Sequence, residues 1–298
     1  MKIFITGGLG FIGSHLAPKL IGGGHKLLLL SRQPLRSRSN SITFVKGDLN
    51  NLESFKNKLK KFKPDAVVHL AWEGLEDYDF RAMTSLRNTV NSLNLVSLAV
   101  SLGCKKFLSV GSCWEYGNDE GALKESTLFR PPLHAPDLVI AKRAIKAIGE
   151  QVALQGGMQF LWPRLFFAYG PGQKPRTLIA SLARAFRNGT RPEIKNRLGG
   201  NDFVYIEDAV EAIIKILEKC KRQKVVYNIG SGKITSVTEI ANIVARNFGK
   251  ASIIKEPKKP LGFYADISKI RREIGWRPKT SLKEGVGKTI DYYNKNND

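Results

Sequence analysis

A glycine-rich turn near the N-terminus is the strongest chemical signal in the sequence. Gly7, Gly10 and Gly13 follow an apolar segment at Lys2–Thr6 and open an amphipathic helix predicted over Phe11–Ile21. A tight turn needs backbone angles that glycine tolerates, and a pyrophosphate reaches backbone N–H groups only where no Cβ intervenes. The helix dipole and the unpaired N–H groups of the first helical turn also favour a negative charge. The three glycines therefore predict a dinucleotide-binding turn.

The end of the second predicted strand indicates which dinucleotide binds. The segment reads Leu30-Ser31-Arg32-Gln33, and further arginines follow at Arg36 and Arg38. An acidic side chain here would accept hydrogen bonds from the adenosine ribose of NAD, whereas a hydroxyl and a guanidinium suit a 2′-phosphate. Ser31 and Arg32 therefore favour NADP(H) over NAD(H). Asp48, after the third strand, either contacts the adenine edge or caps the next helix.

The bulk composition narrows the class of protein. The chain has 298 residues, 42% hydrophobic and 25% charged, with a formal charge of +22. No apolar run approaches the ~18 residues of a membrane span, and a signal-peptide pattern is absent. Cys104, Cys113 and Cys220 have no paired or metal-like spacing, so we expect a cytoplasmic protein without a metal site. The charge attracts anions, but no nucleic-acid-binding motif accompanies it, so no specific nucleic acid is expected.

Short apolar runs alternate with helical periodicity over the first two-thirds of the chain, the pattern of βαβ units around a parallel sheet. The predicted strands are Lys2–Thr6, Lys26–Ser31, Ile42–Lys46, Asp65–Leu70, Lys105–Val110 and Gln159–Arg164. The predicted helices are Phe11–Ile21, Leu52–Phe62, Thr84–Leu102 and Leu138–Leu154. We expect an α/β fold with a Rossmann-type doubly wound parallel sheet at residues 1–168. A smaller C-terminal α/β substrate-binding region is expected at residues 169–298, with some segments returning to the first domain.

An ordered series of short motifs continues the glycine turn along nearly the whole chain. They are Gly47-Asp48-Leu49, His69-Leu70-Ala71, Gly111-Ser112-Cys113-Trp114-Glu115-Tyr116-Gly117, Pro163-Arg164-Leu165-Phe166, Tyr169-Gly170-Pro171-Gly172, Asp202-Phe203-Val204-Tyr205-Ile206-Glu207-Asp208, Tyr227-Asn228-Ile229-Gly230-Ser231-Gly232 and Gly275-Trp276-Arg277-Pro278. With these motifs the chain resembles the extended short-chain dehydrogenase/reductases, and among them the NAD(P)-dependent nucleotide-sugar epimerases, dehydratases and reductases. The resemblance implies an enzyme acting on a nucleotide sugar. It adds Phe11, Ile12, Leu49, Leu70 and Ala71 to the predicted cofactor site.

The same resemblance assigns the chemistry to Ser112 and Lys142. In this family a Ser or Thr polarises the reacting sugar oxygen, while a Tyr-x-x-x-Lys pair moves the proton and binds the nicotinamide ribose. A nearby ammonium favours the phenolate, which brings the tyrosine toward working pH. The resemblance places Ser112 and Trp114 against the substrate. It also implies a homodimer formed by the helices at Thr84–Leu102 and Leu138–Leu154.

The chain departs from this pattern at the proton-transfer position. Leu138 stands four residues before Lys142, where the family has its tyrosine. Leucine cannot transfer a proton, and loss of a general acid or base costs ~10²–10⁴-fold in rate. Three readings follow: His134, Asp137 or Tyr116 replaces the tyrosine, a water bridges the gap, or the protein is impaired and only binds its cofactor.

A second departure concerns the substrate phosphates. Phe167 stands where relatives often carry an asparagine that contacts the diphosphate of the nucleotide sugar. A phenyl ring cannot make that contact, so Phe167 is expected to pack in the core. Lys174, Arg176 and Arg197 are the predicted substitutes, because their cations can hold phosphates.

The residues after Ser112 indicate which reaction the family chemistry serves. Dehydratases of the family place acids there, because elimination of water needs a general acid and base. Here Cys113 and Trp114 follow, which disfavours dehydration. The stretch Ser112-Cys113-Trp114-Glu115-Tyr116-Gly117, with the NADP-type end of the second strand, resembles the family's NADP(H)-dependent reductases. The resemblance implies a reductase that delivers hydride to C4 of a nucleotide-linked 4-keto-6-deoxy sugar. A nucleotide-sugar 4-epimerase is the enzymatic alternative, and a cofactor-binding protein with impaired catalysis is the alternative of another class.

Overall fold

The computed structural model of the protein describes residues 1–37, 39–75, 79–117, 120–132, 134–190, 192–194, 196–251 and 254–296. The chain divides into two compact units. Unit 1 consists of Met1–Asn118, Leu128–Arg164 and Ile213–Tyr227, and unit 2 of Asp119–Thr127, Leu165–Ala212 and Asn228–Asp298. Among the described residues, no helix is long and apolar enough to cross a membrane.

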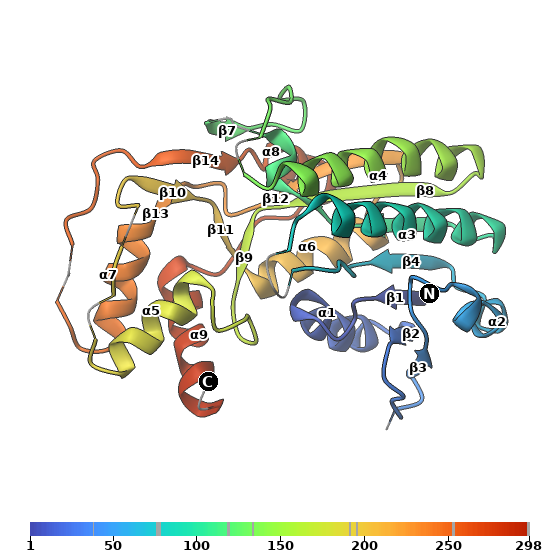
Figure 1. The fold of residues 1–298 in the computed structure, drawn as a ribbon, viewed down its shortest axis with the longest axis horizontal. Coiled ribbons are helices and arrows are strands. Elements are labelled where there is room, and N and C mark those ends of the chain that lie inside the picture. Colours follow the sequence, from blue (N-terminus) through green and yellow to red (C-terminus); the bar gives the residue numbers. More distant parts are fainter. Residues whose placement is uncertain are drawn as a thin grey trace. The chain divides into compact units, whose positions relative to one another are not determined.

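Strands and helices alternate along most of the chain (Figure 1). The strands are β1 (Lys2–Thr6), β2 (Lys26–Ser31), β3 (Ile42–Lys46), β4 (Ala66–His69), β5 (Lys106–Ser109), β6 (Gly111–Ser112), β7 (Gly121–Leu123), β8 (Gln159–Leu165), β9 (Phe167–Tyr169), β10 (Gly199–Asn201), β11 (Phe203–Tyr205), β12 (Lys224–Ile229), β13 (Thr235–Ser236) and β14 (Leu261–Ala265). The helices are α1 (Phe11–Gly22), α2 (Glu53–Phe62), α3 (Ala82–Ser101), α4 (Pro136–Gln155), α5 (Leu178–Arg187), α6 (Ile206–Lys219), α7 (Val237–Asn247), α8 (Ser268–Ile274) and α9 (Leu282–Asn296), with a 3₁₀ turn η1 at Cys113–Tyr116.

The sheet of unit 1 has the strand order β12-β8-β5-β4-β1-β2-β3, with β6 beside β8. Neighbouring strands from β8 to β3 are parallel, and Ile3 of β1 pairs with Leu27 of β2 on one side and Ala66 of β4 on the other. Along the chain, β1, β2 and β3 follow one another toward one edge of the sheet, and β4, β5, β8 and β12 follow one another toward the other edge. This confirms the predicted Rossmann-type α/β fold, in which ligands bind beyond the carboxyl ends of the strands where the order reverses.

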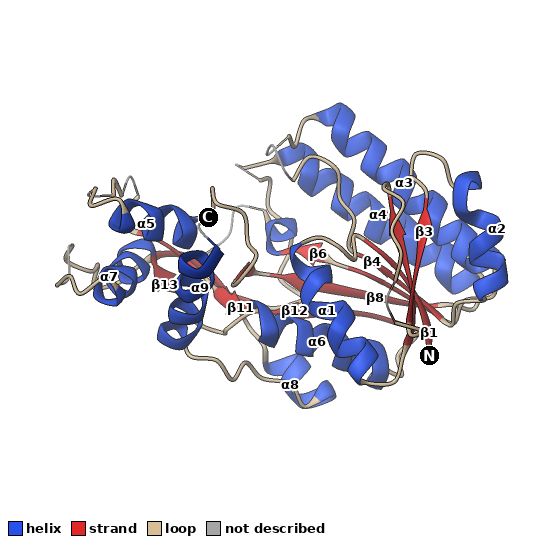
Figure 2. Cartoon of the chain, turned by 90° about the horizontal axis from the view of Figure 1, so that it is seen from below, coloured by secondary structure: helices blue, strands red, loops and turns tan. Residues whose placement is uncertain are grey.

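Helices cover both faces of this sheet. Figure 2 shows α2, α3 and α4 on one face, and α1 with the α6 segment on the other. The core below the first face is one apolar cluster that joins Phe4 and Phe107 of the strands to Phe55, Leu95 and Ile145 of the three helices. Because a buried parallel sheet needs apolar residues on both faces, its strands are nearly continuous apolar runs.

The observed elements agree closely with those predicted in unit 1. The first three strands have the predicted bounds, and the other strand and helix ends differ by one or two residues. The largest differences, of two residues, are at the starts of α3, at Ala82 rather than Thr84, and of α4, at Pro136 rather than Leu138. Proline is favourable in the first helical turn, because its fixed φ suits the helix and its missing N–H would have no partner there.

Unit 2 contains smaller sheets with helices packed around them. Its four-stranded sheet has the order β13-β10-β14-β7, and β11 pairs in parallel with β9. Helices α5, α7 and α9 pack against one another. Asp202, between β10 and β11, is fully buried and accepts backbone N–H groups of Gly232 and Ala265, each at 3.0 Å.

Candidate cofactor and active site

The glycine turn after β1 has the shape that a bound pyrophosphate requires. Gly7 has φ +72°, and a Cβ there would lie 2.6 Å from the backbone nitrogen of Ala71. At Gly13 a Cβ would lie 2.3 Å from the carbonyl oxygen of Gly7. Gly10 caps α1 without a side-chain hydrogen bond, and the first turn of α1 contains no acidic residue. The first-turn N–H groups are thus left to an anion, and the residues present fit the phosphates of a dinucleotide.

The other residues predicted for the cofactor surround this turn or follow neighbouring strands. Phe11 and Ile12 begin α1 and are half-buried. Leu70 and Ala71 follow β4, where the backbone N–H of Leu70 donates to the carbonyl of Thr6 at 3.0 Å. Leu49 follows β3 and packs against the core cluster. The structure therefore brings these residues to the carboxyl ends of β1, β3 and β4, and their contact with a cofactor stays a prediction.

The end of β2 presents one hydroxyl and one exposed guanidinium. Ser31 is buried, and its hydroxyl accepts the backbone N–H of Gln33 at 3.2 Å. Arg32 is exposed, and no acidic residue lies between it and Arg36. Arg38 lies outside the described residues. This arrangement leaves the Arg32 cation available beside the strand end.

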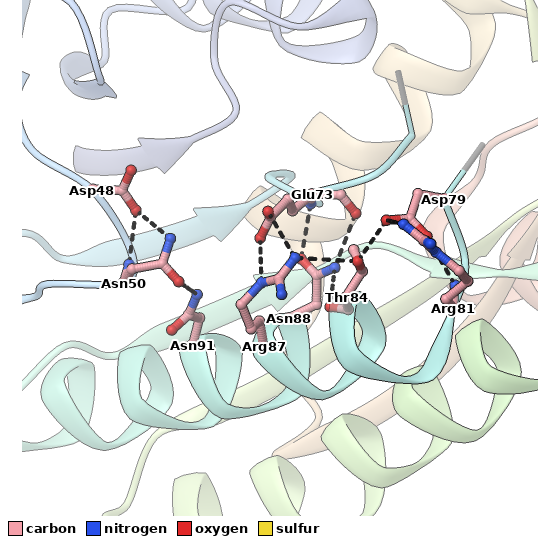
Figure 3. Close-up of polar contacts among 9 residues, drawn as sticks. All are labelled: Asp48, Asn50, Glu73, Asp79, Arg81, Thr84, Arg87, Asn88 and Asn91. Atoms are coloured by element: carbon pink, nitrogen blue, oxygen red, sulfur yellow. Dashed lines mark hydrogen bonds and ion pairs between the residues drawn. The ribbon is translucent and has the colours of Figure 1, made fainter. Parts of the chain in front are cut away.

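Asp48 shapes the loop after β3 instead of capping α2. Its Oδ1 accepts the backbone N–H and the side-chain Nδ2 of Asn50, both at 2.8 Å, and Asn50 in turn accepts from Asn91 of α3 at 2.9 Å (Figure 3). The residue that caps α2 is Leu52, which makes no side-chain hydrogen bond. Of the two alternatives for Asp48, the helix cap is therefore wrong, and the adenine contact stays a prediction.

Helix α3 also holds the loop after β4 (Figure 3). Asn88 accepts the backbone N–H of Glu73 at 2.8 Å and donates to the Glu73 carbonyl at 3.0 Å. Further along, Asp79 accepts from Thr84 and from Arg81, both at 2.7 Å. These contacts fix the backbone on either side of the 76–78 segment, which lies outside the described residues.

Ser112 and Glu115 form a capping box, and both carboxylate oxygens of Glu115 accept hydrogen bonds. The backbone N–H of Ser112 donates to Glu115 Oε1 at 2.7 Å, and the Ser112 hydroxyl accepts the backbone N–H of Trp114 at 3.2 Å. Glu115 is 1% exposed and also accepts from Trp162 Nε1 at 3.0 Å and Arg164 Nε at 3.1 Å. Glu115 is therefore a structural anion that holds the Ser112 turn, and it is committed to four hydrogen bonds with these three partners.

Lys142 lies beside the same strand end, one helical turn after Leu138. Its Nζ donates to the carbonyl of Val110 at 2.8 Å and lies 4.0 Å from the centre of the Trp72 ring. Burial lowers the pKa of Lys142 to about 8, and the Glu115 carboxylate opposes part of that decrease. The structure thus brings Lys142 next to the Ser112 turn, as the family pattern requires. Sequence reasoning missed Trp72, whose position directly after His69-Leu70-Ala71 was the available signal.

The groups proposed to replace the tyrosine differ in their surroundings. Leu138 itself is buried, with 5% of its surface exposed. Tyr116 is also buried, and the guanidinium carbon of Arg164 lies 4.5 Å from the centre of its ring. His134 is exposed just before α4, and Asp137 is half-buried in the first turn of that helix. Of the three, only Tyr116 is buried in the turn that Ser112 caps.

His69, the last residue of β4, is buried and neutral. Its Nδ1 lies 2.7 Å from Thr6 Oγ1 and its Nε2 lies 2.8 Å from Ser92 Oγ. Burial first, and the Lys142 charge second, lower the pKa of His69 to about 3. Both ring nitrogens are therefore engaged in packing the sheet against α3, and the ring carries no charge at neutral pH.

The residues predicted for the substrate fall in both units. Trp114 belongs to unit 1, where its ring meets Phe80 edge-on at 5.9 Å. Phe167 belongs to unit 2, where it packs against Phe203 at 5.8 Å between ring centres, as expected. The predicted phosphate ligands all belong to unit 2 and are exposed: Lys174, Arg176 and Arg197.

The strand order and the glycine turn after β1 define a Rossmann-type α/β protein. The model of the NAD dependent epimerase/dehydratase family matches residues 3–230 of the chain. The chain belongs to this family, which confirms the resemblance found in the sequence.

Individual relatives are similar over the full length of the chain. "Protein CapI" of Staphylococcus aureus is 25% identical, with 98% of each chain covered. The Arabidopsis thaliana trifunctional UDP-glucose 4,6-dehydratase/UDP-4-keto-6-deoxy-D-glucose 3,5-epimerase/UDP-4-keto-L-rhamnose-reductase RHM1 is 27% identical, and the chain spans 47% of its length. The structure of MoeE5 in complex with UDP-glucuronic acid and NAD superposes with a TM-score of 0.86 at 26% identity, covering 99% of this chain and 100% of MoeE5.

Proposed function

We propose that the protein is an NADP(H)-dependent reductase of a nucleotide-linked 4-keto-6-deoxy sugar, with hydride delivered to C4. The observation that carries this proposal is the environment of Glu115. It is the acid nearest to Ser112 in sequence, and Ser112, Trp162 and Arg164 consume its hydrogen-bonding capacity in the core. A dehydratase needs an acid and a base for elimination, whereas a ketone reduction needs one proton and a stabilised oxygen. The dehydratase, epimerase and reductase activities that the name of RHM1 gives, all on UDP-linked sugars, support the substrate class.

The preference for NADP(H) rests on the end of β2. The exposed Arg32 guanidinium suits a 2′-phosphate, and the segment lacks the acid that would bind a free ribose hydroxyl. MoeE5 carries NAD in its structure, so the preference is a property proposed for this chain. The phosphates would lie on the turn at Gly7, Gly10 and Gly13, and the bound nicotinamide supplies the hydride.

Ser112 and Lys142 are the residues that would act on the sugar oxygen. The Ser112 hydroxyl accepts the N–H of Trp114, so its own proton is directed away from that turn and can be donated to the carbonyl oxygen. The Lys142 ammonium would donate a proton to the sugar C4 oxygen when the ketone is reduced. The neutral amine then recovers a proton from water. A pKa of about 8 suits such a donor, because general acids work best near the operating pH.

The test follows NADPH oxidation by the purified protein against a panel of nucleotide-linked 4-keto-6-deoxyhexoses, with NADH in parallel. We expect turnover by the wild-type chain that decreases as the pH rises through about 8, where Lys142 loses its proton. Lys142→Met should lose ~10²-fold or more in rate. Lys146→Met is the matched control, because Lys146 lies one turn further along α4 and pairs with Glu150 at 3.1 Å.

Leu138→Tyr separates this proposal from a second one. The buried Leu138 favours the alternative that the natural chain binds its cofactor without turnover. Turnover by Leu138→Tyr alone would establish that alternative. Turnover by neither protein, with NADPH still bound, would refute the reductase proposal. Because Tyr78 is the one tyrosine outside the described residues, Tyr78→Phe is included, and loss of turnover in that variant would remove Lys142 as the donor.

We further propose that α3 and α4 form a homodimer with a second copy of the chain. The two helices pack together, and large apolar side chains remain exposed on both: Met83, Leu86, Val90, Ile140 and Ile148. Such a surface on a folded chain is typical of a protein interface. Light scattering should give a dimer for the wild type and a monomer for Ile148→Asp. The free, buried cysteines among the described residues support a reducing, cytoplasmic location.

A further inference from the structure

Unit 2 contains a pocket of about 1040 Å³ that is lined entirely by its own residues. Its charged lining is unbalanced, because five cationic side chains face two acidic ones, Glu239 and Asp266. None of the residues predicted for cofactor or substrate belongs to the lining. The five cations are Lys233, Arg271, Arg272, Arg277 and Lys279.

Two of these cations, Arg272 and Lys279, form ion pairs, whereas Arg271 and Arg277 form none among the described residues. Arg272 pairs with Glu273 at 3.3 Å, and Lys279 pairs with Glu211 at 3.0 Å. Within the described part of the chain, the side chains of Arg271 and Arg277 make no ion pair or hydrogen bond. The acidic Asp266 forms no ion pair with them among the described residues, and its Oδ1 accepts the backbone N–H of Ser268 at 2.8 Å and also the Ser268 hydroxyl.

A buried carboxylate and a buried indole fix the wall that carries Arg277. Asp208 accepts the backbone N–H groups of Lys279 at 3.1 Å and Thr280 at 2.9 Å. Trp276 is fully buried, and its Nε1 donates to the Asp208 carbonyl at 3.0 Å. The backbone that presents Arg277 is therefore held on both sides.

A second buried carboxylate fixes another part of the pocket lining. Asp202 accepts the backbone N–H groups of Ser231 and of Gly232, and also that of Ala265 at 3.0 Å. A Cβ at Gly230 would lie 2.5 Å from the Asp202 carboxylate, which is too close for any side chain. Only glycine therefore allows the loop to pass this close to Asp202. On this loop the Ser231 hydroxyl donates to the Lys233 carbonyl at 3.3 Å, and the exposed Lys233 side chain lines the pocket.

We propose that this pocket binds an organic phosphate at a site separate from the predicted cofactor and substrate residues. Guanidinium groups suit phosphate oxygens because their N–H donors form a planar fork. The volume of about 1040 Å³ exceeds what a bare phosphate fills and matches a small organic ligand. Because buried carboxylates fix these parts of the lining, binding needs little ordering of the backbone, which favours affinity.

The experiment titrates inorganic pyrophosphate into the full-length protein by calorimetry. Arg271→Gln/Arg277→Gln removes the two unpaired guanidinium charges, and Lys233→Gln is a second, independent variant. We expect the double variant to lose one class of pyrophosphate sites, with its affinity at least tenfold weaker. Pyrophosphate bound elsewhere, including at the glycine turn, is common to all variants and is retained.

Lys258→Gln/Lys259→Gln is the matched control, because it removes two exposed cations of unit 2 that neither line the pocket nor belong to the predicted substrate residues. It should leave this class of sites intact. Superimposable isotherms for the wild type and the Arg271/Arg277 variant would overturn the proposal. So would an equal loss in the control, because the attraction would then be the general effect of a +22 chain.

Discussion

The Lys142 amine should make the stability of unit 1 depend on pH in an unusual direction. Burial lowers its pKa from 10.5 to about 8 in the folded chain. Between these pH values the unfolded chain therefore binds more protons than the folded chain, so stability rises with pH. A pKa decrease of this size corresponds to about 3 kcal/mol at about 1.4 kcal/mol per pKa unit. That free energy is the cost of keeping the ammonium charged inside the fold below pH 8.

Lys142→Met measures this cost directly. Methionine keeps the apolar stem and removes the amine together with its hydrogen bond to Val110. We would determine the free energy of unfolding of both proteins in urea at several pH values from 7 to 10.5. The difference, wild type minus variant, should increase by up to about 3 kcal/mol across that range. Other groups titrate in both proteins and cancel in the difference.

Two results would refute the reasoning. A difference that stays constant with pH would show that the ammonium is not penalised in the fold, and that it is a poor proton donor at neutral pH. A difference that decreases would mean that the Trp72 ring and the Glu115 carboxylate stabilise the cation by more than burial costs. Lys146→Met provides the control for loss of a lysine from the same helix.

Three further predictions follow from the site. Glu115→Gln should destabilise the fold by about 3 kcal/mol or more in urea or thermal unfolding, because it leaves the Arg164 guanidinium buried beside a neutral side chain; a change below 1 kcal/mol would contradict this. Gly13→Ala should abolish NADPH binding measured by nucleotide fluorescence, since its Cβ would meet the Gly7 carbonyl at 2.3 Å, whereas Gly10→Ala, with 3.3 Å to the same oxygen, should weaken it far less. Arg32→Ala should weaken NADPH about tenfold and leave NADH unchanged, and equal effects on both would remove the basis for the NADP(H) preference.

Much of unit 1 is predictable because its signals are local. β1, β2 and β3 have the predicted bounds, since runs of apolar residues buried on both faces end at glycine or polar residues. The glycine turn is equally local, because the conformations of Gly7 and Gly13 depend on the few residues around them and on the strand before them. The Leu138 substitution is visible in the sequence for the same reason, through its fixed spacing from Lys142.

The surroundings of each reactive group depend on segments that meet only in the folded chain. Sequence identifies Lys142, but the register of β4 beside β5 and the packing of α4 on the sheet decide that Trp72 lies over its ammonium. Likewise, Glu115 follows Ser112 in sequence, but Trp162 and Arg164 on β8 decide that it is a buried structural anion. The unit 2 pocket depends on tertiary structure in the same way. The carboxylates of Asp202 and Asp208 hold its lining, and they are distant in sequence from Lys233 and Arg277, which line it. Backbone preference and apolar periodicity act over a few residues, whereas side-chain pairing and desolvation depend on tertiary packing.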